Sequence, residues 1–434
     1  MPIPVIDLFA GPGGLGEGFS SLLDSKGGRV FKIKLSIEKD EPAHRTLELR
    51  AFFREFPVGE VPQDYYDYLA HKISLEDLYS RHPRQAERAW LEAWHAELGG
   101  KETSDGEIDE RIELALGTNT RNWVLIGGPP CQAYSLVGRS RIIGGEGIEK
   151  YEEDPRHDLY RQYLRILAVH RPPIFVMENV KGLLSATVKK AHIFEQILAD
   201  LKRPPLVSGR VQKDNLEYQL FPLVANRGEV SGRFEPEDFV IRSEEFGIPQ
   251  SRHRIIILGI RSDWPRKPDL LNPEKTQIAI EQAIGDLPKL RSGLSKEPDS
   301  TQEWHNAICG LVKAKWFLNG EMDEGLRKAL AIAVMRIGAD LSRGSEFVTT
   351  NAKPECHKDW FADAKLNGVC NHDTRSHIRS DLHRYFFAAV FARKNGRSPL
   401  LDDFPTALLP EHENVPRQQN LWVDSSGSGS RPNV

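Results

Sequence analysis

The sequence predicts an α/β protein built on a doubly wound, mostly parallel sheet. Short apolar runs end in glycine-rich or charged residues and are followed by segments with helical periodicity, which is typical of this class. The first run, residues 4–9, leads into a glycine turn at 10–14, and a second run at 33–37 ends at Glu38. Residues 41–54 have a helical pattern. A strand–helix–strand order of this kind predicts parallel pairing.

Three further apolar runs predict buried strands at residues 123–127, 174–177 and 255–258. A helix is expected over 157–169, between the first two of these strands. Residues 60–118 are polar, with aromatic residues at helical spacing, and predict a helical insertion in the α/β pattern.

The alternation of strands and helices stops near residue 268, which predicts a first domain over 1–268. The mixed composition of 269–420, with helical segments at 279–286 and 323–336, predicts a smaller, irregular second domain. Residues 421–434 are rich in serine and glycine and are expected to form a flexible tail.

Composition narrows the setting of the protein. The chain has 434 residues, a formal net charge of -4 and four cysteines. Few cysteines in this length favour a reducing compartment. No run of 18 apolar residues and no signal-peptide pattern occurs, so we expect no membrane partner. Nucleic-acid binding would depend on local basic patches.

The carboxyl ends of the predicted strands carry the candidate site residues, because open α/β sheets bind ligands there. The glycine turn has neither the Lys-Ser/Thr of a P-loop nor the usual dinucleotide spacing, and by itself it could be a simple connection. Glu38 could accept hydrogen bonds from a ribose or could be a solvated strand end.

Cys131 follows Pro129-Pro130 at a strand end, where the prolines stiffen the backbone that carries the thiol. This placement favours a nucleophile over an inert buried cysteine. Glu178 ends a strongly apolar strand, so burial should raise its pKa and suit it to general acid work. The alternative is a helix cap at Glu178 or Asn179.

Two arginines, Arg252 and Arg254, flank His253 at the start of a strand, and alternation places them on one face. They could bind an oxygen-rich ligand or form a solvated edge. Residues 138–156 are rich in glycine and charge and predict a mobile loop.

Taken together, these motifs resemble the cytosine-5 DNA methyltransferase family of prokaryotic type. The matching segments are 7–14 (Asp-Leu-Phe-Ala-Gly-Pro-Gly-Gly), 128–132 (Gly-Pro-Pro-Cys-Gln), 178–180 (Glu-Asn-Val) and 250–254 (Gln-x-Arg-x-Arg). The resemblance implies a Rossmann-like, S-adenosylmethionine-dependent methyltransferase domain and a target-recognition region over 269–420.

The resemblance also implies the chemistry. Cys131 would add to carbon 6 of a flipped cytosine, Glu178 would bind and protonate ring nitrogen 3, and Arg254, supported by Arg252, would hold the carbonyl oxygen. The cofactor S-adenosylmethionine would lie against Phe9, Ala10, Gly11, Gly13, Gly14, Glu38 and Pro130. The DNA contacts would come from Gln132, Arg139, Arg141, Arg375 and Arg379. The family's acid near the adenine amine is not assigned, because the insertion at 60–118 hides its position.

A basic stretch at 371–397 has six Lys/Arg residues against two Asp. It could contact DNA phosphates or form a helix with a solvated charged face. Nearby histidines with Cys356 and Cys370 match no standard zinc spacing, so we expect no metal.

The family's last two sequence blocks are not found before Val434. We therefore expect weak cofactor binding by this chain alone and a second chain or segment that completes the pocket. The resemblance implies double-stranded DNA as the substrate, a restriction–modification setting with a cognate endonuclease, and the prokaryotic cytoplasm, at the nucleoid. A catalytically silent DNA-binding subunit and a tRNA cytosine-5 methyltransferase are the alternatives.

Overall fold

The computed structural model describes residues 2–117, 121–130, 157–185, 187–188, 191–204, 217–224, 234–264, 266–319, 322–338 and 340–410. Cys131, the predicted loop at 138–156 and the predicted tail at 421–434 lie outside these ranges. The chain forms two compact units, Met1–Asp286 with Lys353–Leu366, and Leu287–Ala352 with Asn367–Val434. The division therefore falls at 286 rather than 268, and a short later segment belongs to the first unit.

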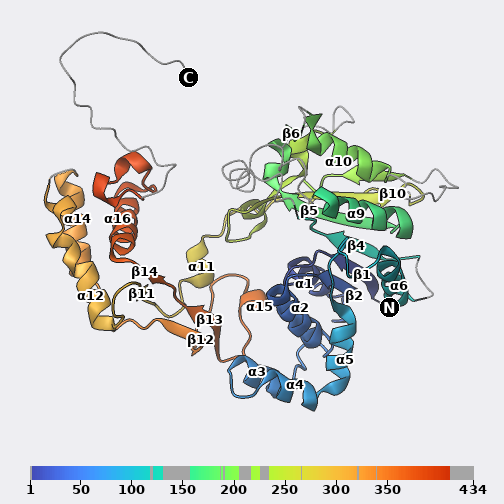
Figure 1. The fold of residues 1–434 in the computed structure, drawn as a ribbon, viewed down its shortest axis with the longest axis horizontal. Helices are drawn as coiled ribbons and strands as arrows, with labels where there is room; N and C mark the ends of the chain where they lie inside the picture. Colours follow the sequence, from blue (N-terminus) through green and yellow to red (C-terminus); the bar gives the residue numbers. More distant parts are fainter. Residues whose placement is uncertain are drawn as a thin grey trace, which may run out of the picture. The chain divides into compact units, whose positions relative to one another are not determined.

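An eight-stranded sheet forms the centre of the first unit (Figure 1). Its order is β3 (Ala93–His95), β2 (Phe31–Glu38), β1 (Ile3–Leu8), β4 (Val124–Gly127), β5 (Ile174–Val180), β10 (His253–Arg261) and β8 (Tyr218–Phe221), with β9 (Val240–Arg242) also paired to β10. The strands from β3 to β5 are parallel, whereas β10 is antiparallel to β5, β8 and β9. The predicted doubly wound, mostly parallel sheet is confirmed.

The strand order locates the ligand-binding edge. From β1 the chain moves outward to β2 and β3, and then returns to β4 on the other side of β1. A ligand crevice is expected at the carboxyl ends of strands where the order reverses in this way. The antiparallel direction of β10 also brings its first residues to the carboxyl end of β5, where Arg254 pairs with Val180.

Helices cover both faces of this sheet, as the period of two in β10 requires. Ile255 and Ile257 pack in a core with α6 (Asp105–Leu116), α9 (His157–His170) and α10 (Ile193–Lys202). Ile256 and Leu258 face the opposite core, which is shared with α1 (Gly14–Ser20). Helix α2 (Glu41–Arg54), which follows β2, packs in a third core with the insertion helices.

The insertion at 60–118 contains α3 (Gln63–Leu69), α4 (Leu75–Arg81), α5 (Pro83–Glu92) and α6. Helical structure was expected there, but the segment also supplies β3, the edge strand of the sheet. The returning segment 353–366, which includes α15 (Lys358–Phe361), packs on this insertion: the Tyr66 hydroxyl donates to Asp363 Oδ2 at 2.8 Å.

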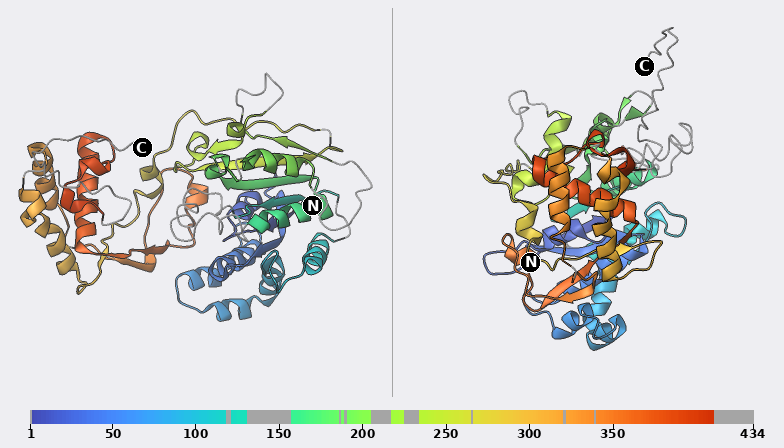
Figure 2. Two further views of the ribbon diagram at one scale, coloured as in Figure 1. Left: turned by 45° about the horizontal axis from the view of Figure 1, so that its top comes forward. Right: turned by 90° about the vertical axis from the view of Figure 1, so that its left-hand side faces the viewer.

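The second unit has its own core. Helices α12 (Thr301–Cys309), α13 (Lys315–Leu318), α14 (Glu324–Val334) and α16 (Arg379–Asn395) enclose apolar residues that include Leu330 and Phe387. Figure 2 shows α12, α14 and α16 grouped in this unit. Two small sheets complete it, β12 (Gly344–Thr349) with β13 (Gly368–Asp373), and β11 (Gly293–Leu294) with β14 (Ser376–His377).

Smaller elements connect these parts of the chain. The helical prediction at 279–286 corresponds to α11 (Ile280–Ile284), and that at 323–336 to α14. The short strands β6 (Thr187–Val188) and β7 (Ala191–His192) pair with each other. Among the described residues, 3-10 helices form at Lys181–Ser185, Pro236–Phe239, Ser243–Phe246, Gly310–Lys313, Leu401–Asp403 and Thr406–Leu408. Within the described ranges, every helix is too short or too polar to span a bilayer.

Candidate active site

The glycine turn after β1 is held against the end of β2. The Ala10 amide donates to the Ile37 carbonyl at 3.1 Å, and the Gly11 amide donates to Glu38 Oε2 at 2.7 Å. Gly13 has φ 89°, and a Cβ there would lie 2.9 Å from Leu47 Cδ1, so only glycine fits without a shift. Gly14 then begins α1.

Phe9 has φ 56°, a left-handed conformation that costs a non-glycine residue about 1–2 kcal/mol. This backbone directs the ring to a pocket at the carboxyl edge, where it lies with Glu38 and Pro130. Three of the predicted cofactor residues are thus brought together, whereas Ala10, Gly11, Gly13 and Gly14 are not among its lining residues.

The pocket measures about 90 Å³, and part of its wall was missed from the sequence. Ala96, Glu97 and Leu98, the residues that follow β3, line it together with Phe9, Glu38 and Pro130. Glu97 Oε1 accepts a hydrogen bond from Lys39 Nζ at 2.8 Å. Only a three-residue strand precedes this wall, and so short a run has no readable alternation.

Glu38 is the polar centre of this pocket. Its Oε2 accepts the Gly11 amide and its Oε1 accepts the Asp40 amide, each at 2.7 Å. Each carboxylate oxygen retains a further lone pair, and these could accept hydroxyl groups of a sugar. The side chain is therefore fixed in place before any ligand arrives.

A second cluster lies at the ends of β5 and β10. Glu178 Oε1 is 2.7 Å from Arg254 Nε, and both side chains are partly exposed. Burial raises the pKa of Glu178 above its ordinary value, while the positive charges of Arg254 and Arg252 oppose that shift. Raising the pKa lets this carboxyl hold a proton at a higher pH than a surface glutamate.

The chain after β4 passes directly beside this carboxyl. A Cβ on Gly128 would lie 3.2 Å from Glu178 Oε2, so glycine permits the close approach. The Asn179 side chain is buried and donates to the Pro129 carbonyl at 3.3 Å, which fixes the prolines to β5. Asn179 therefore braces this segment, and it is not the cap of a helix. Cys131 follows Pro130 in the sequence but lies outside the described residues.

The two arginines differ in their surroundings. Arg254 lies in β10 against Glu178, whereas Arg252 precedes the strand and is exposed. Its carbonyl accepts from the Ser243 amide at 3.1 Å and from the Ser243 hydroxyl at 2.7 Å, which anchors its backbone.

The predicted DNA contacts fall into two groups. Gln132, Arg139 and Arg141 lie outside the described residues. In the second unit, Arg379 is paired with Glu297 at 2.6 Å, while Arg375 is exposed and has no ion pair with any described residue. Of these two arginines, Arg375 is therefore the one that remains available to bind a phosphate.

Fold and site together define a Rossmann-like α/β protein. It has a carboxylate held by two backbone amides at the end of β2 and a carboxyl of raised pKa, paired with arginine, at the end of β5. A model of the C-5 cytosine-specific DNA methylase family matches residues 92–203 and 226–330, which together make half of the chain. The chain belongs to this family. The matched ranges include Cys131, Glu178, Arg252 and Arg254 but leave out the glycine turn.

Several curated relatives and a solved structure match part of the chain. Type II methyltransferase M.Bpa9945I of Bacillus paralicheniformis is 28% identical over 305 residues, covering 66% of this chain and 61% of the relative. Type II methyltransferase M.DdeI of Desulfomicrobium norvegicum is 26% identical over 296 residues, covering 67% and 49%. A solved putative DNA modification methyltransferase from an E. coli prophage is 19% identical, covers 68% of this chain and 58% of that one, and gives a TM-score of 0.39. The chain thus spans less than two thirds of the curated relatives it matches.

Proposed function

We propose that this protein transfers a methyl group from S-adenosylmethionine to carbon 5 of cytosine in duplex DNA. The observation that carries this proposal is the Glu178–Arg254 pair, which lies beside the Gly128-Pro129-Pro130 segment that leads to Cys131. Membership of the C-5 cytosine methylase family supports a catalytic role in methyl transfer for Glu178, Arg254 and Cys131.

The cofactor would lie at the pocket between the glycine turn and the residues after β3. Phe9 supplies an aromatic face, Glu38 supplies fixed acceptors for ribose hydroxyls, and Pro130 forms part of the wall. When bound there, S-adenosylmethionine supplies an electrophilic methyl group on a sulfonium centre.

In the proposed mechanism the target cytosine leaves the helix, at a cost of a few kcal/mol. The Cys131 thiolate forms a bond to carbon 6, and Glu178 donates its proton to ring nitrogen 3, which makes carbon 5 nucleophilic. Arg254 holds the ring carbonyl oxygen. After carbon 5 has gained the methyl group, ring nitrogen 3 returns its proton to Glu178. Carbon 5 then loses its own proton to a base, and the thiolate departs as the 5,6 double bond re-forms.

The decisive experiment traps the covalent intermediate. Duplex DNA carrying 5-fluorocytosine should form a stable adduct with the wild-type chain and cofactor, because fluorine cannot leave as the proton does. Cys131→Ser should form no adduct and transfer no methyl group, yet bind duplex DNA with nearly unchanged affinity, since its DNA-binding surface is intact. Methylation by the serine variant at a rate near wild type would show that the nucleophile is misassigned.

The substrate class needs its own comparison. Tritiated methyl transfer to duplex DNA and to tRNA, under the same conditions, separates the proposed activity from a tRNA methyltransferase. The relatives are named Type II methyltransferases, which supports a restriction–modification role for this chain. A cognate endonuclease and action on DNA in the prokaryotic cytoplasm are further parts of the proposal. Preferential transfer to tRNA would overturn the DNA assignment.

A partner-dependent form of the activity is favoured by two observations. The cofactor pocket measures about 90 Å³, well below the ~300–1,000 Å³ of small-molecule sites. Ile256 and Leu258, on the face of β10 away from α9 and α10, are only partly buried. We therefore propose that a further segment, on this chain or another, covers that face and completes the pocket.

Calorimetry on the 434-residue chain tests this second proposal. Weak binding of S-adenosylmethionine, strengthened when a covering segment is supplied in fused form or as a second chain, is the expected result. Tight, stoichiometric binding together with full turnover by the chain alone would show that its own residues complete the pocket.

A further inference from the structure

Among the described residues, part of β2 is unpaired on the side that faces away from β1. Strand β1 pairs with β2 from Ile3↔Phe31 to Leu8↔Ile37, with a shift of register that leaves Lys34 without a β1 partner. On the other side, β3 pairs only with Ser36–Glu38. Among the described residues, therefore, no strand bonds to the 31–35 half of β2 on that side. Unpaired backbone groups at a sheet edge are a template for another strand.

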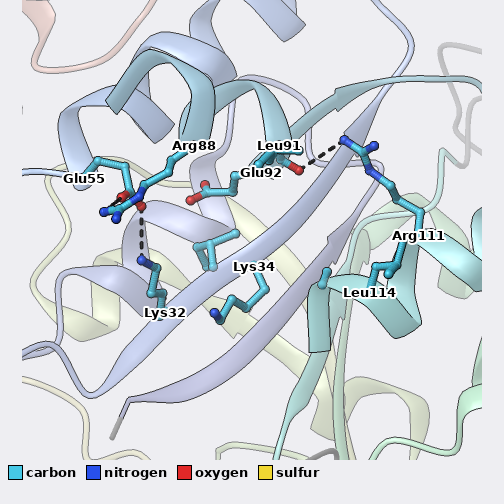
Figure 3. A pocket seen from close by; sticks show the side chains of 10 residues that line it. Lys32, Lys34, Glu55, Arg88, Leu91, Glu92, Arg111 and Leu114 are labelled. Atoms are coloured by element: carbon cyan, nitrogen blue, oxygen red, sulfur yellow. Dashed lines mark hydrogen bonds and ion pairs between the residues drawn. The ribbon is translucent and has the colours of Figure 1, made fainter. Parts of the chain in front are cut away.

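A pocket of about 340 Å³ opens at this half of β2 (Figure 3). Residues of α5 form one wall and residues of α6 form the other, with Ile33 of β2 between them. Leu91 of α5 is 57% exposed and Leu114 of α6 is 72% exposed, so the two walls carry apolar side chains that nothing in the described residues covers. We call this feature the β2 notch.

The charge of the β2 notch is unbalanced. Lys32 and Arg88 share one carboxylate, Glu55, at 3.1 Å each, and Glu92 is already paired with Arg54. Two further cations of the notch lining, Lys34 and Arg111, are therefore left without a carboxylate of the notch to pair with.

Those two cations, Lys34 and Arg111, have no acidic partner among the described residues. The Lys34 side chain is exposed and makes no hydrogen bond or ion pair with another described residue. Arg111 donates to the Leu91 carbonyl at 3.3 Å and stacks on Trp94 at 5.3 Å. The notch thus presents excess positive charge next to a free strand edge.

The simplest alternative is that Lys32 and Lys34 only protect the strand edge from pairing with other chains. Proteins often place lysine on an exposed edge to prevent unwanted strand pairing. That reading accounts for Lys32 and Lys34 but leaves the two exposed leucines and the hollow between them unexplained. A second copy of this chain is a poor occupant, because it would bring the same excess positive charge to the edge.

We propose that the β2 notch binds an extended, acidic segment of a partner protein, which adds to the sheet as a strand beside residues 31–35. Its backbone would pair with β2, alternate apolar side chains would pack between Leu91 and Leu114, and its carboxylates would face Lys34 and Arg111. Strand addition of this kind takes affinity from main-chain hydrogen bonds and specificity from alternate side chains. The notch uses none of the residues assigned to methyl transfer, so the proposal is independent of that activity.

The test uses the full chain and a fluorescein-labelled peptide of sequence Asp-Val-Glu-Ile-Asp-Val-Glu, followed by fluorescence anisotropy. We expect saturable binding, lost when the acids are replaced by lysine or when alternate backbone nitrogens are methylated. Lys34→Glu combined with Arg111→Glu should weaken binding by about tenfold or more. Lys26→Glu, which reverses an exposed lysine in a turn elsewhere in the first unit, should leave binding unchanged.

Hydrogen exchange provides a readout that does not depend on the variants. Amides within residues 31–35 should become protected in the peptide complex, and those of the second unit should not. Absence of saturable binding, or binding that survives both backbone methylation and charge reversal, would overturn the proposal. Displacement of the peptide by short duplex DNA, with protection of the same amides, would instead assign the notch to nucleic acid.

Discussion

Replacing Arg54 with methionine should destabilise the first unit far more than replacing a surface arginine. Arg54 of α2 makes ion pairs with Glu17 of α1 and Glu92 of α5, and its side chain is only 6% exposed. Glu92 is 7% exposed, and burial raises its pKa even though Arg54 opposes the shift. Removing the arginine leaves that carboxylate buried without a counter-charge, which typically costs about 3–5 kcal/mol.

The matched control is Arg88→Met. Arg88 also pairs with a buried glutamate, Glu55, but Arg88 itself is 64% exposed and Lys32 remains as a second partner of Glu55. Loss of Arg88 should therefore cost only about 0–1 kcal/mol. The assay is the urea dependence of hydrogen exchange at the amides of β1 and β2, which reports the unfolding free energy of the first unit itself.

Two further results would follow from the same reasoning. Arg54→Met combined with Glu92→Leu should recover most of the loss, because an apolar replacement removes the stranded charge. In the single variant the pKa of folded Glu92 lies further above its unfolded value. The loss of unfolding free energy in Arg54→Met, relative to wild type, should therefore be small near pH 4 and grow as the pH rises toward the folded pKa of Glu92. A loss no larger than that of Arg88→Met, or one independent of pH, would refute the reasoning.

Three other substitutions give separate tests. Glu178→Gln should slow single-turnover methyl transfer by about 100- to 10,000-fold with little change in cofactor affinity, since the amide cannot protonate the ring; normal turnover would remove the general acid role. Asp7 is fully buried, and burial raises its pKa to about 8. Relative to Asp7→Asn, the wild-type unfolding free energy should therefore fall between about pH 4 and pH 8, by up to about 1.4 kcal/mol per pH unit, and a flat difference would contradict this. Glu38→Ala should weaken S-adenosylmethionine binding in calorimetry by roughly 10- to 100-fold, through loss of charge-assisted hydrogen bonds, while the exposed Glu41→Ala should not.

The interior strands β1, β4 and β5 could be predicted because they are mostly buried on both faces, and they appear in the sequence as apolar runs bounded by glycine, proline or charge. β2 and β10 are covered less completely, but each still has an apolar stretch long enough to predict a strand. Such continuous runs are expected for strands covered by helices on two sides. The same signal fails for β3, which has three residues, one of them histidine, and lies at the sheet edge. The pocket wall formed by Ala96, Glu97 and Leu98 was missed for that reason.

Contacts between distant parts of the chain have no local signal at all. The segment 353–366 lies in a region with the composition of the second unit, yet it packs on the first. Tyr66 binds Asp363, and Lys365 Nζ donates to the Gly59 and Val61 carbonyls at 2.9 and 3.1 Å. These are single polar contacts between groups far apart in sequence, one between two side chains and two from a side chain to the backbone, so periodicity and composition cannot reveal them.

The pairing of Glu178 with Arg254 depends on the direction of β10, which the sequence motif does not give. Sequence alternation predicted that Arg252 and Arg254 share a face, but it could not say which acid they would meet. Because β10 runs antiparallel to β5, its second residue reaches the carboxyl end of β5, and Arg254 lies 2.7 Å from Glu178. Arg252 precedes the strand and remains exposed, so it acts on Glu178 only through its charge. If β10 were parallel to β5, its first residues would lie at the opposite edge of the sheet, and the carboxyl of raised pKa would have no cation to orient it.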